Sequence, residues 1–231
     1  MDKNAINKNM EQKQQDNSVI NQPKRQPDER GSFHLQGHIK IFDPETQEVY
    51  IDKPNAIHYE NLSEALALCL SNRTTGFIHE MHFGNGGTSV DATGIITYLP
   101  TNTTGSNSNL YNPTYYKVVD DNSNLNVDPL RNKIEVRHIA GKLYTDVLVT
   151  CLLDYGEPSG QTAFDNATDL SQDYVFDELG LKAWPGADVG VGNGKLLTHV
   201  VFHPVQKSLN RLIQIEYTIR IQTLTNLTNA N

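Results

Sequence analysis

The stretch at residues 55–88, NAIHYENLSEALALCLSNRTTGFIHEMHFGNGGT, passes from a turn to a helix, a strand and a glycine-rich loop. Asn61 followed by Glu64 indicates a helix cap with a reciprocal acidic residue one turn later. Apolar residues then recur at the spacing of one helical face, at Leu62, Ala65, Leu66, Cys69 and Leu70. We therefore expect one short helix that packs on a core.

A strand is predicted after this helix, because the pattern changes to simple alternation beyond Gly76. Alternation places Phe77, His79, Met81 and Phe83 on one face, and Ile78, Glu80 and His82 on the other. The strand ends at residues 84–87, Gly-Asn-Gly-Gly, where positive φ angles carry no steric cost. We expect the chain either to turn sharply there or to let another backbone approach closely.

Length and composition favour one soluble domain. The chain has 231 residues, a formal net charge of −8 and 37% hydrophobic residues, with the apolar deficit concentrated in tails and loops. The acidic balance argues against general nucleic-acid binding, which normally needs a basic face. No apolar run approaches the ~20 residues that cross a bilayer, and the first residues lack a signal-peptide core. We expect synthesis in the cytoplasm and no membrane partner.

Three regions are predicted along the chain. Residues 1–32 are rich in Asn, Gln, Lys and Asp, so they should form an extended, disordered N-terminal arm that becomes ordered only against a partner such as a neighbouring subunit. Residues 33–225 should form a single β-rich domain, and residues 226–231 a polar tail. Cys69 and Cys151 both lie in apolar patterns, which predicts two buried thiols, no disulfide and a reducing compartment.

The remaining periodicity predicts mostly strands. Residues 38–51 form a hairpin around Asp43-Pro44, residues 95–99 a short strand, and residues 101–109 an exposed polar loop. Residues 133–153 could be a hairpin or one bent strand, and Gly141 favours the bent strand.

The clearest strand lies near the end of the chain, where residues 213–222 alternate without error. Its expected partner is residues 196–202, joined to it by a turn at residues 204–210. Trp184 is expected to cover the side of the core. The fold class is therefore mainly β, an antiparallel β-sandwich-like body with one short helix and an extended N-terminal arm.

Two residue patterns are candidates for a cofactor or metal site. The glycine run at residues 190–195 departs from a phosphate-binding loop, because Val189 stands where the first glycine belongs and no Ser or Thr follows Lys195. Neither of two histidine pairs suits a metal. His79 and His82 are three residues apart and would face opposite sides of a strand, whereas His199 and His203 would need a helix where Pro204 and the β-rich run argue against one. Surface or hydrogen-bonded core histidines are the expectation.

Catalysis by acids is also unsupported. The spacing of Glu80, Asp91, Asp120 and Asp121 is that of ordinary solvated acids. The sequence contains no G-x-S-x-G nucleophile elbow, and neither cysteine lies in a catalytic pattern. We therefore expect a protein that is not an enzyme and assign no catalytic, cofactor-binding or metal-binding residue.

Several runs resemble structural proteins from the virions of tailed bacteriophages. They are residues 43–46, 52–58, 81–88, 176–181 and 197–208 together with the closing strand, and the resemblance covers about residues 37–223. It implies a non-enzymatic neck or collar subunit that forms a homo-oligomeric ring at the head–tail junction. Such a subunit would contact portal, connector, tail or fibre proteins. DNA would pass through the ring without specific binding, and the protein would enter the virion after assembly in the host bacterial cytoplasm.

Other virion roles stay open at this point. A capsid decoration protein or another tail component would fit the same resemblance. A carbohydrate-binding or receptor-binding fibre module is a further alternative, because β-sandwiches often bind sugars on exposed aromatic faces. Trp184 would then line a groove with Tyr111, Tyr115 and Tyr116, and a buried Trp184 would remove the main residue of that hypothesis.

Overall fold

The computed structural model describes residues 31–158 and 174–225. It divides into a compact unit at residues 33–223, on which the following paragraphs concentrate, and a second unit made of residues 1–32 and 224–231. The predicted tail, and all but the last two residues of the predicted arm, lie outside the described residues. The elements are β1 (Gly31–Phe42), β2 (Val49–Ile57), α2 (Tyr59–Leu70), β3 (Ile78–Gly84), β4 (Thr88–Val90), β5 (Ile96–Tyr98), β6 (Pro113–Val118), β7 (Lys133–His138), β8 (Tyr144–Leu153), β9 (Tyr174–Ala183), β10 (Thr198–Lys207) and β11 (Ile213–Thr225).

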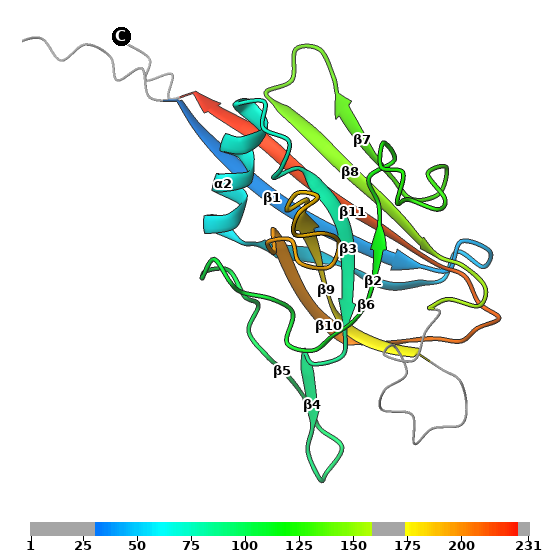
Figure 1. Cartoon of the computed structure of the whole chain (residues 1–231). Helices are drawn as coiled ribbons and strands as arrows, with labels where there is room; N and C mark the ends of the chain where they lie inside the picture. The colour runs from blue at the N-terminus through cyan, green and yellow to red at the C-terminus, as the bar shows by residue number, and fades with distance from the viewer. Residues whose placement is uncertain (1–30, 159–173, 226–231) are drawn as a thin grey trace, which may run out of the picture. The chain divides into compact units, whose positions relative to one another are not determined.

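Nine of these strands form one antiparallel sheet that curls on itself, in the order β6-β3-β9-β10-β2-β1-β11-β8-β7 (Figure 1). The curl occurs where β10 meets β2, because only Thr198 and His199 pair there, with Ile57 and Ala56. The sheet thus has two halves whose inner faces enclose the core. This confirms the predicted fold class of a mainly β, sandwich-like body with one short helix.

The core draws on both halves of the sheet. In β11, Ile213, Ile215 and Tyr217 are fully buried, as their alternation predicts. From the other half, Phe176 of β9 packs edge-to-face on Phe83 of β3, with ring centroids 5.4 Å apart. Burying side chains of this size contributes about 1.5–3 kcal/mol each, so the enclosed faces hold the two halves together.

The predicted partner of the closing strand is wrong. β11 pairs with β8, from Ile213 opposite Leu153 to Gln222 opposite Tyr144, and its other neighbour is β1. Residues 198–207 form β10 in the other half of the sheet and pair with β9. β10 continues through Pro204 because the register shifts between Val201 and Val205, where a residue without an N–H is tolerated.

The structure confirms the predicted hairpin at residues 38–51 and contradicts the bent strand that was favoured at residues 133–153. Residues 133–153 form a hairpin of β7 and β8, so the bent strand that Gly141 favoured is wrong; Gly141 lies in the connecting turn with φ +83°. The hairpin of β1 and β2 is confirmed. In its turn the Asp43 carboxylate accepts the backbone N–H groups of Glu45 at 2.8 Å and Thr46 at 3.1 Å.

Helix α2 lies where predicted but begins differently. Its N-cap is His58, whose Nδ1 accepts the backbone N–H of Asn61 at 3.2 Å, so the predicted cap at Asn61 is wrong. Asn61 is instead buried in the first turn and donates its side-chain N–H to the Leu196 carbonyl. Leu62 and Ala65 pack on a second apolar cluster with Ile57, Ala183 and Leu197. The last turn is exposed, including Leu70 and the Cys69 thiol that was expected to be buried; Cys151 is buried.

Candidate functional site

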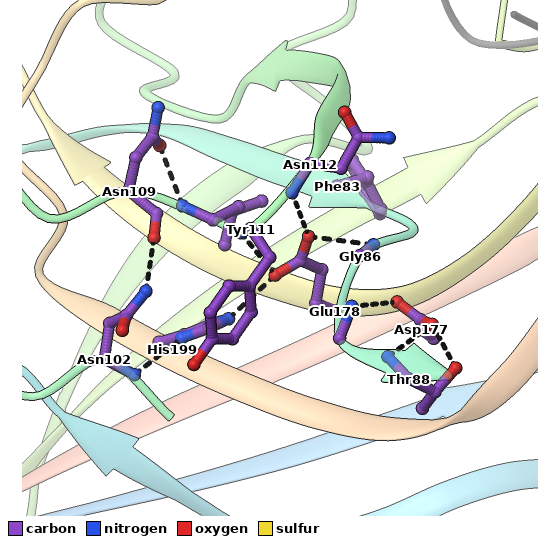
Figure 2. Close-up of polar contacts among 12 residues, drawn as sticks. Phe83, Gly86, Thr88, Asn102, Asn109, Tyr111, Asn112, Asp177, Glu178 and His199 are labelled. Atoms are coloured by element: carbon purple, nitrogen blue, oxygen red, sulfur yellow. Dashed lines mark hydrogen bonds and ion pairs between the residues drawn. The ribbon is translucent and has the colours of Figure 1, made fainter. Parts of the chain in front are cut away.

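Three of the runs that carry the phage resemblance meet in space. Residues 81–88, 176–181 and 197–208 are far apart in the chain, yet they contribute to β3, β9 and β10, which are adjacent strands. Their inward side chains build the core, while their other side chains include buried acids and histidines. Loops that follow β3 and precede β6 lie against these polar groups, so this region is the candidate site (Figure 2).

Glu178 of β9 is the centre of the site and is fully buried. One carboxylate oxygen accepts the backbone N–H groups of Gly86 at 3.1 Å and Asn112 at 2.8 Å. The other accepts the backbone N–H of Tyr111 at 2.9 Å and the His199 Nε2–H at 3.0 Å (Figure 2). Two separate loops are therefore held by one side chain.

The electrostatics of Glu178 favour the ionised form. Burial raises the pKa of this carboxyl group, because it removes water from the charge. The hydrogen bonds from His199 and from the three backbone N–H groups lower the pKa by more, so it lies below its ordinary value. The carboxylate is thus charged at neutral pH and accepts from four donors.

His199 connects a third loop to this centre. It is fully buried on β10, and its Nδ1 accepts the backbone N–H of Asn102 at 2.8 Å. The ring hydrogen must therefore be on Nε2, where it donates to Glu178. Asn102 also donates from its side chain to the Asn109 carbonyl at 2.7 Å (Figure 2). The polar loop at residues 101–109 is therefore fastened to the sheet.

Asp177 anchors the chain on the other side of the glycine-rich loop. Its carboxylate accepts the backbone N–H groups of Gly87 and Thr88, both at 2.9 Å, and the Thr88 hydroxyl. The glycines permit this close approach without positive φ angles. A Cβ at Gly84 would lie 2.5 Å from a Glu178 oxygen, and one at Gly86 would lie 2.8 Å from the Asn112 nitrogen. Of the two expected roles of this loop, close backbone approach is the observed one.

The anchored chain continues into a projecting hairpin of β4 and β5, which form a separate two-stranded sheet (Figure 1). In its turn one Asp91 oxygen accepts from the Thr93 N–H, the Thr93 hydroxyl and the Ile95 N–H. Val90 is 63% exposed and Ile95 62% exposed. A hairpin held at both its base and its turn therefore presents apolar side chains to solvent.

A second polar cluster surrounds Glu80 of β3, which is fully buried, so its interpretation as a solvated acid is wrong. The carboxylate accepts from the Gly192 N–H at 2.9 Å, and pairs with His82 Nε2 at 2.6 Å and His79 Nδ1 at 3.3 Å. A register shift between Ile78 and Glu80 lets histidines three residues apart reach one carboxylate. Burial lowers the pKa of His82 by more than its bond to Glu80 raises it.

The glycine run at residues 190–195 is explained by the same cluster. Gly190 and Gly192 have φ angles of +78° and +86°, and a Cβ at Gly194 would lie 1.8 Å from the Ala183 carbonyl oxygen. Lys182 Nζ donates to the Gly192 carbonyl at 3.2 Å, next to the N–H that Glu80 accepts. Backbone geometry therefore accounts for these glycines.

The other candidates are dispersed. His203 is exposed and lies 3.3 Å from the Tyr98 hydroxyl, whereas His199 is buried. Asp120 and Asp121 accept backbone N–H groups of Asn122 and Ile134. Within residues 31–158 and 174–225, no three His, Cys, Asp or Glu side chains are arranged to hold a metal ion.

The four aromatic residues of the sugar-binding hypothesis each pack on a different neighbour. Trp184, half-buried, lies on His79 with centroids 4.4 Å apart, and Tyr116 stacks on His82 at 5.2 Å. Tyr111 lies beside His199 at 5.6 Å. Tyr115 is half-buried and packs on the core. Histidine contacts of this kind fit the expectation of hydrogen-bonded core histidines for His79, His82 and His199.

Comparison with known proteins finds no matching family model, no matching curated protein and no matching solved structure. Among the helices in the described part of the chain, none is long and apolar enough to span a membrane. Fold and site together define an antiparallel β protein in which buried carboxylates hold exposed loops in place. Sequence reasoning missed Glu178 and Asp177, although two adjacent acids inside an apolar strand are a signal that could have indicated them.

Proposed function

We propose that this protein is a non-enzymatic structural subunit of a tailed-phage virion, and that it forms a ring as a neck or collar protein at the head–tail junction. The sequence resemblance supports this proposal, and three of the runs that carry it contribute to β3, β9 and β10 around Glu178. The observation that carries it furthest is the hairpin of β4 and β5, anchored by Asp177 and tipped with the exposed side chains of Val90 and Ile95.

The anchors suit a protein whose loops make contacts. The Glu178 carboxylate accepts four hydrogen bonds, three from the backbone of two loops and one from His199 on β10, so it holds these loops in one conformation. A loop ordered in advance loses less conformational entropy when it docks, so more of the contact energy remains as affinity. Exposed apolar side chains on such a loop are typical of the centre of a protein–protein interface.

The edges of the nine-stranded sheet support assembly as well. β6 and β7 are its two outermost strands, and within the described residues no further strand pairs with them. Open edges can join sheets between subunits, and head-to-tail contacts around an axis close into a ring. The net charge of −8 would let DNA slide through such a ring without specific binding. Portal, connector, tail or fibre proteins would be the neighbours in a virion assembled in the host cytoplasm.

Light scattering tests this proposal. The full-length chain, the same chain without residues 1–32, and the double variant Val90→Ser/Ile95→Ser are compared across a concentration series. We expect a closed oligomer for the full-length chain and a smaller mass for the double variant. Leu70→Ser is the control, because Leu70 is 88% exposed and is the last residue of α2, not part of the hairpin. A monomer in every form would contradict a ring that assembles by itself.

A sugar-binding or receptor-binding fibre module is the second candidate, because Tyr111 and Tyr116 are 40% and 39% exposed. A capsid decoration protein or another tail component is a related alternative within the virion. Binding to an array of bacterial surface glycans, lost in Tyr111→Ala or Tyr116→Ala, would favour the fibre module over the ring subunit. Their rings face histidines that are themselves hydrogen-bonded, which favours the structural role.

A further inference from the structure

An apolar groove of about 670 Å³ lies between α2 and the inner faces of β7, β8 and β11. The side chains that line it include Leu66, Phe77, Val136, Val147, Ile219 and Ile221. Ile219 at its floor is buried, whereas Val136 is 71% exposed. Because covering apolar area is worth about 25 cal/mol per Å², an apolar group placed in this open groove would be stabilised by its burial.

Two features of the groove restrict its occupant. Asp120 and Asp121 belong to its lining, and their carboxylates accept the backbone N–H groups of Asn122 and Ile134 without an ion pair to a cation in the described ranges. Their charge favours a partner that carries positive charge next to its apolar residues. β7 borders the groove with Ile134 and Val136 and is the last strand of the sheet. An extended segment could pair with its open edge and direct side chains inward.

A segment with this chemistry precedes β1 in the same sequence. Residues 1–30 are mostly polar, and Val19-Ile20 is their only adjacent pair of β-branched apolar residues. Lys24 and Arg25 follow four and five residues after Ile20. The stretch from Ile20 to Gly31 can span up to roughly 36 Å when extended, at ~3.3 Å per residue, which is enough to reach a neighbouring subunit.

We propose that this groove binds residues 19–20 of a second copy of the chain. Lys24 and Arg25 of that copy then lie near Asp120 and Asp121. The inference rests on the proposed function, because it requires two copies to meet, and it names the contact through which they do so. Each copy both donates a segment and receives one, so the contact is heterologous and can repeat around a ring.

The exposed thiol of Cys69 provides the test, because Cys69 lines the groove and Cys151 is buried. The full-length variant Ile20→Cys is oxidised with copper phenanthroline, separated without reductant, and its linked peptides are identified by mass spectrometry. We expect a disulfide between residues 20 and 69 of different chains, at least about tenfold more abundant than for the control Asn9→Cys, because docking raises the local thiol concentration.

A groove variant makes the result specific. Adding Val136→Asp to Ile20→Cys should reduce the linked species at least about tenfold, since an unpaired charge disfavours apolar docking, and the exposure of Val136 leaves the fold intact. The inference would be overturned if Ile20→Cys and Asn9→Cys formed the disulfide with Cys69 equally, or if neither formed it. A disulfide between residues 20 and 69 of the same chain would show that the groove binds the chain's own segment, which would overturn the second copy as its occupant. A stable oligomer without the link refutes the inference alone, whereas a monomer without it refutes the proposed function too.

Discussion

Replacing Glu178 by Gln should destabilise the protein strongly, although the side chain keeps its size. Each carboxylate oxygen accepts two donors, namely the N–H groups of Gly86 and Asn112 on one and those of Tyr111 and His199 on the other. A glutamine amide offers one accepting oxygen, and its NH₂ would face two donors. His199 cannot adapt by moving its hydrogen to Nδ1, because Nδ1 already accepts from Asn102.

The magnitude follows from the two donors that lose their acceptor. A buried donor left unsatisfied costs about 1–3 kcal/mol, so Glu178→Gln should lower the free energy of unfolding by about 2–6 kcal/mol. That loss is a large share of the 5–15 kcal/mol typical of a domain. Loss of the charge acts in the same direction, because hydrogen bonds to ionised groups are the stronger ones.

Urea unfolding, followed by circular dichroism and by the fluorescence of Trp184, measures this effect. Glu48→Gln is the matched control, since the side chain of Glu48 is 65% exposed, and its midpoint should stay near that of the parent. Hydrogen exchange should also quicken at Gly86, Tyr111 and Asn112. A loss below about 1 kcal/mol, with these amides still protected, would refute the assignment of Glu178 as the loop anchor.

Three further predictions concern pH and glycine. Hydrogen bonding holds the pKa of Glu178 below its ordinary value, so the parent protein should lose stability as the pH falls through and below about 4.3. Glu178→Gln should lose less stability over that range, and urea midpoints at pH 6 and pH 3 measure the difference. Burial lowers the pKa of Lys207 to about 8, so as the pH rises the folded state loses this proton before the unfolded chain does. The stability of the parent protein should therefore rise between pH 8 and about 10, and Lys207→Met should flatten that rise in the same assay. Gly194→Ala should lower the free energy of unfolding by at least about 2 kcal/mol, because the added Cβ would overlap the Ala183 carbonyl. An equal loss for Asn193→Ala, at an exposed position, would argue against this steric reason.

Local sequence patterns were sufficient wherever neighbouring residues decide the outcome. The alternation at residues 213–222 predicts β11 because side chains of a strand face alternate sides. The Asp43-Pro44 turn predicts the hairpin of β1 and β2, since Asp43 bonds to backbone groups two and three residues away. The apolar spacing after residue 61 places α2 to within a few residues, although an unusual cap, His58, starts it.

Tertiary structure alone decided which strands pair and which polar groups are buried. The alternation of β11 suits any partner strand, and only the curl of the sheet assigns it to β8 and β1. Glu80 is an anchor because the N–H of Gly192 reaches it from a distant part of the chain. Glu178 is an anchor because the loops at Gly86 and Tyr111 bring their N–H groups to it. Hydrogen-bond partners are a property of the packed chain, so spacing along the sequence could not identify the backbone groups that these acids hold.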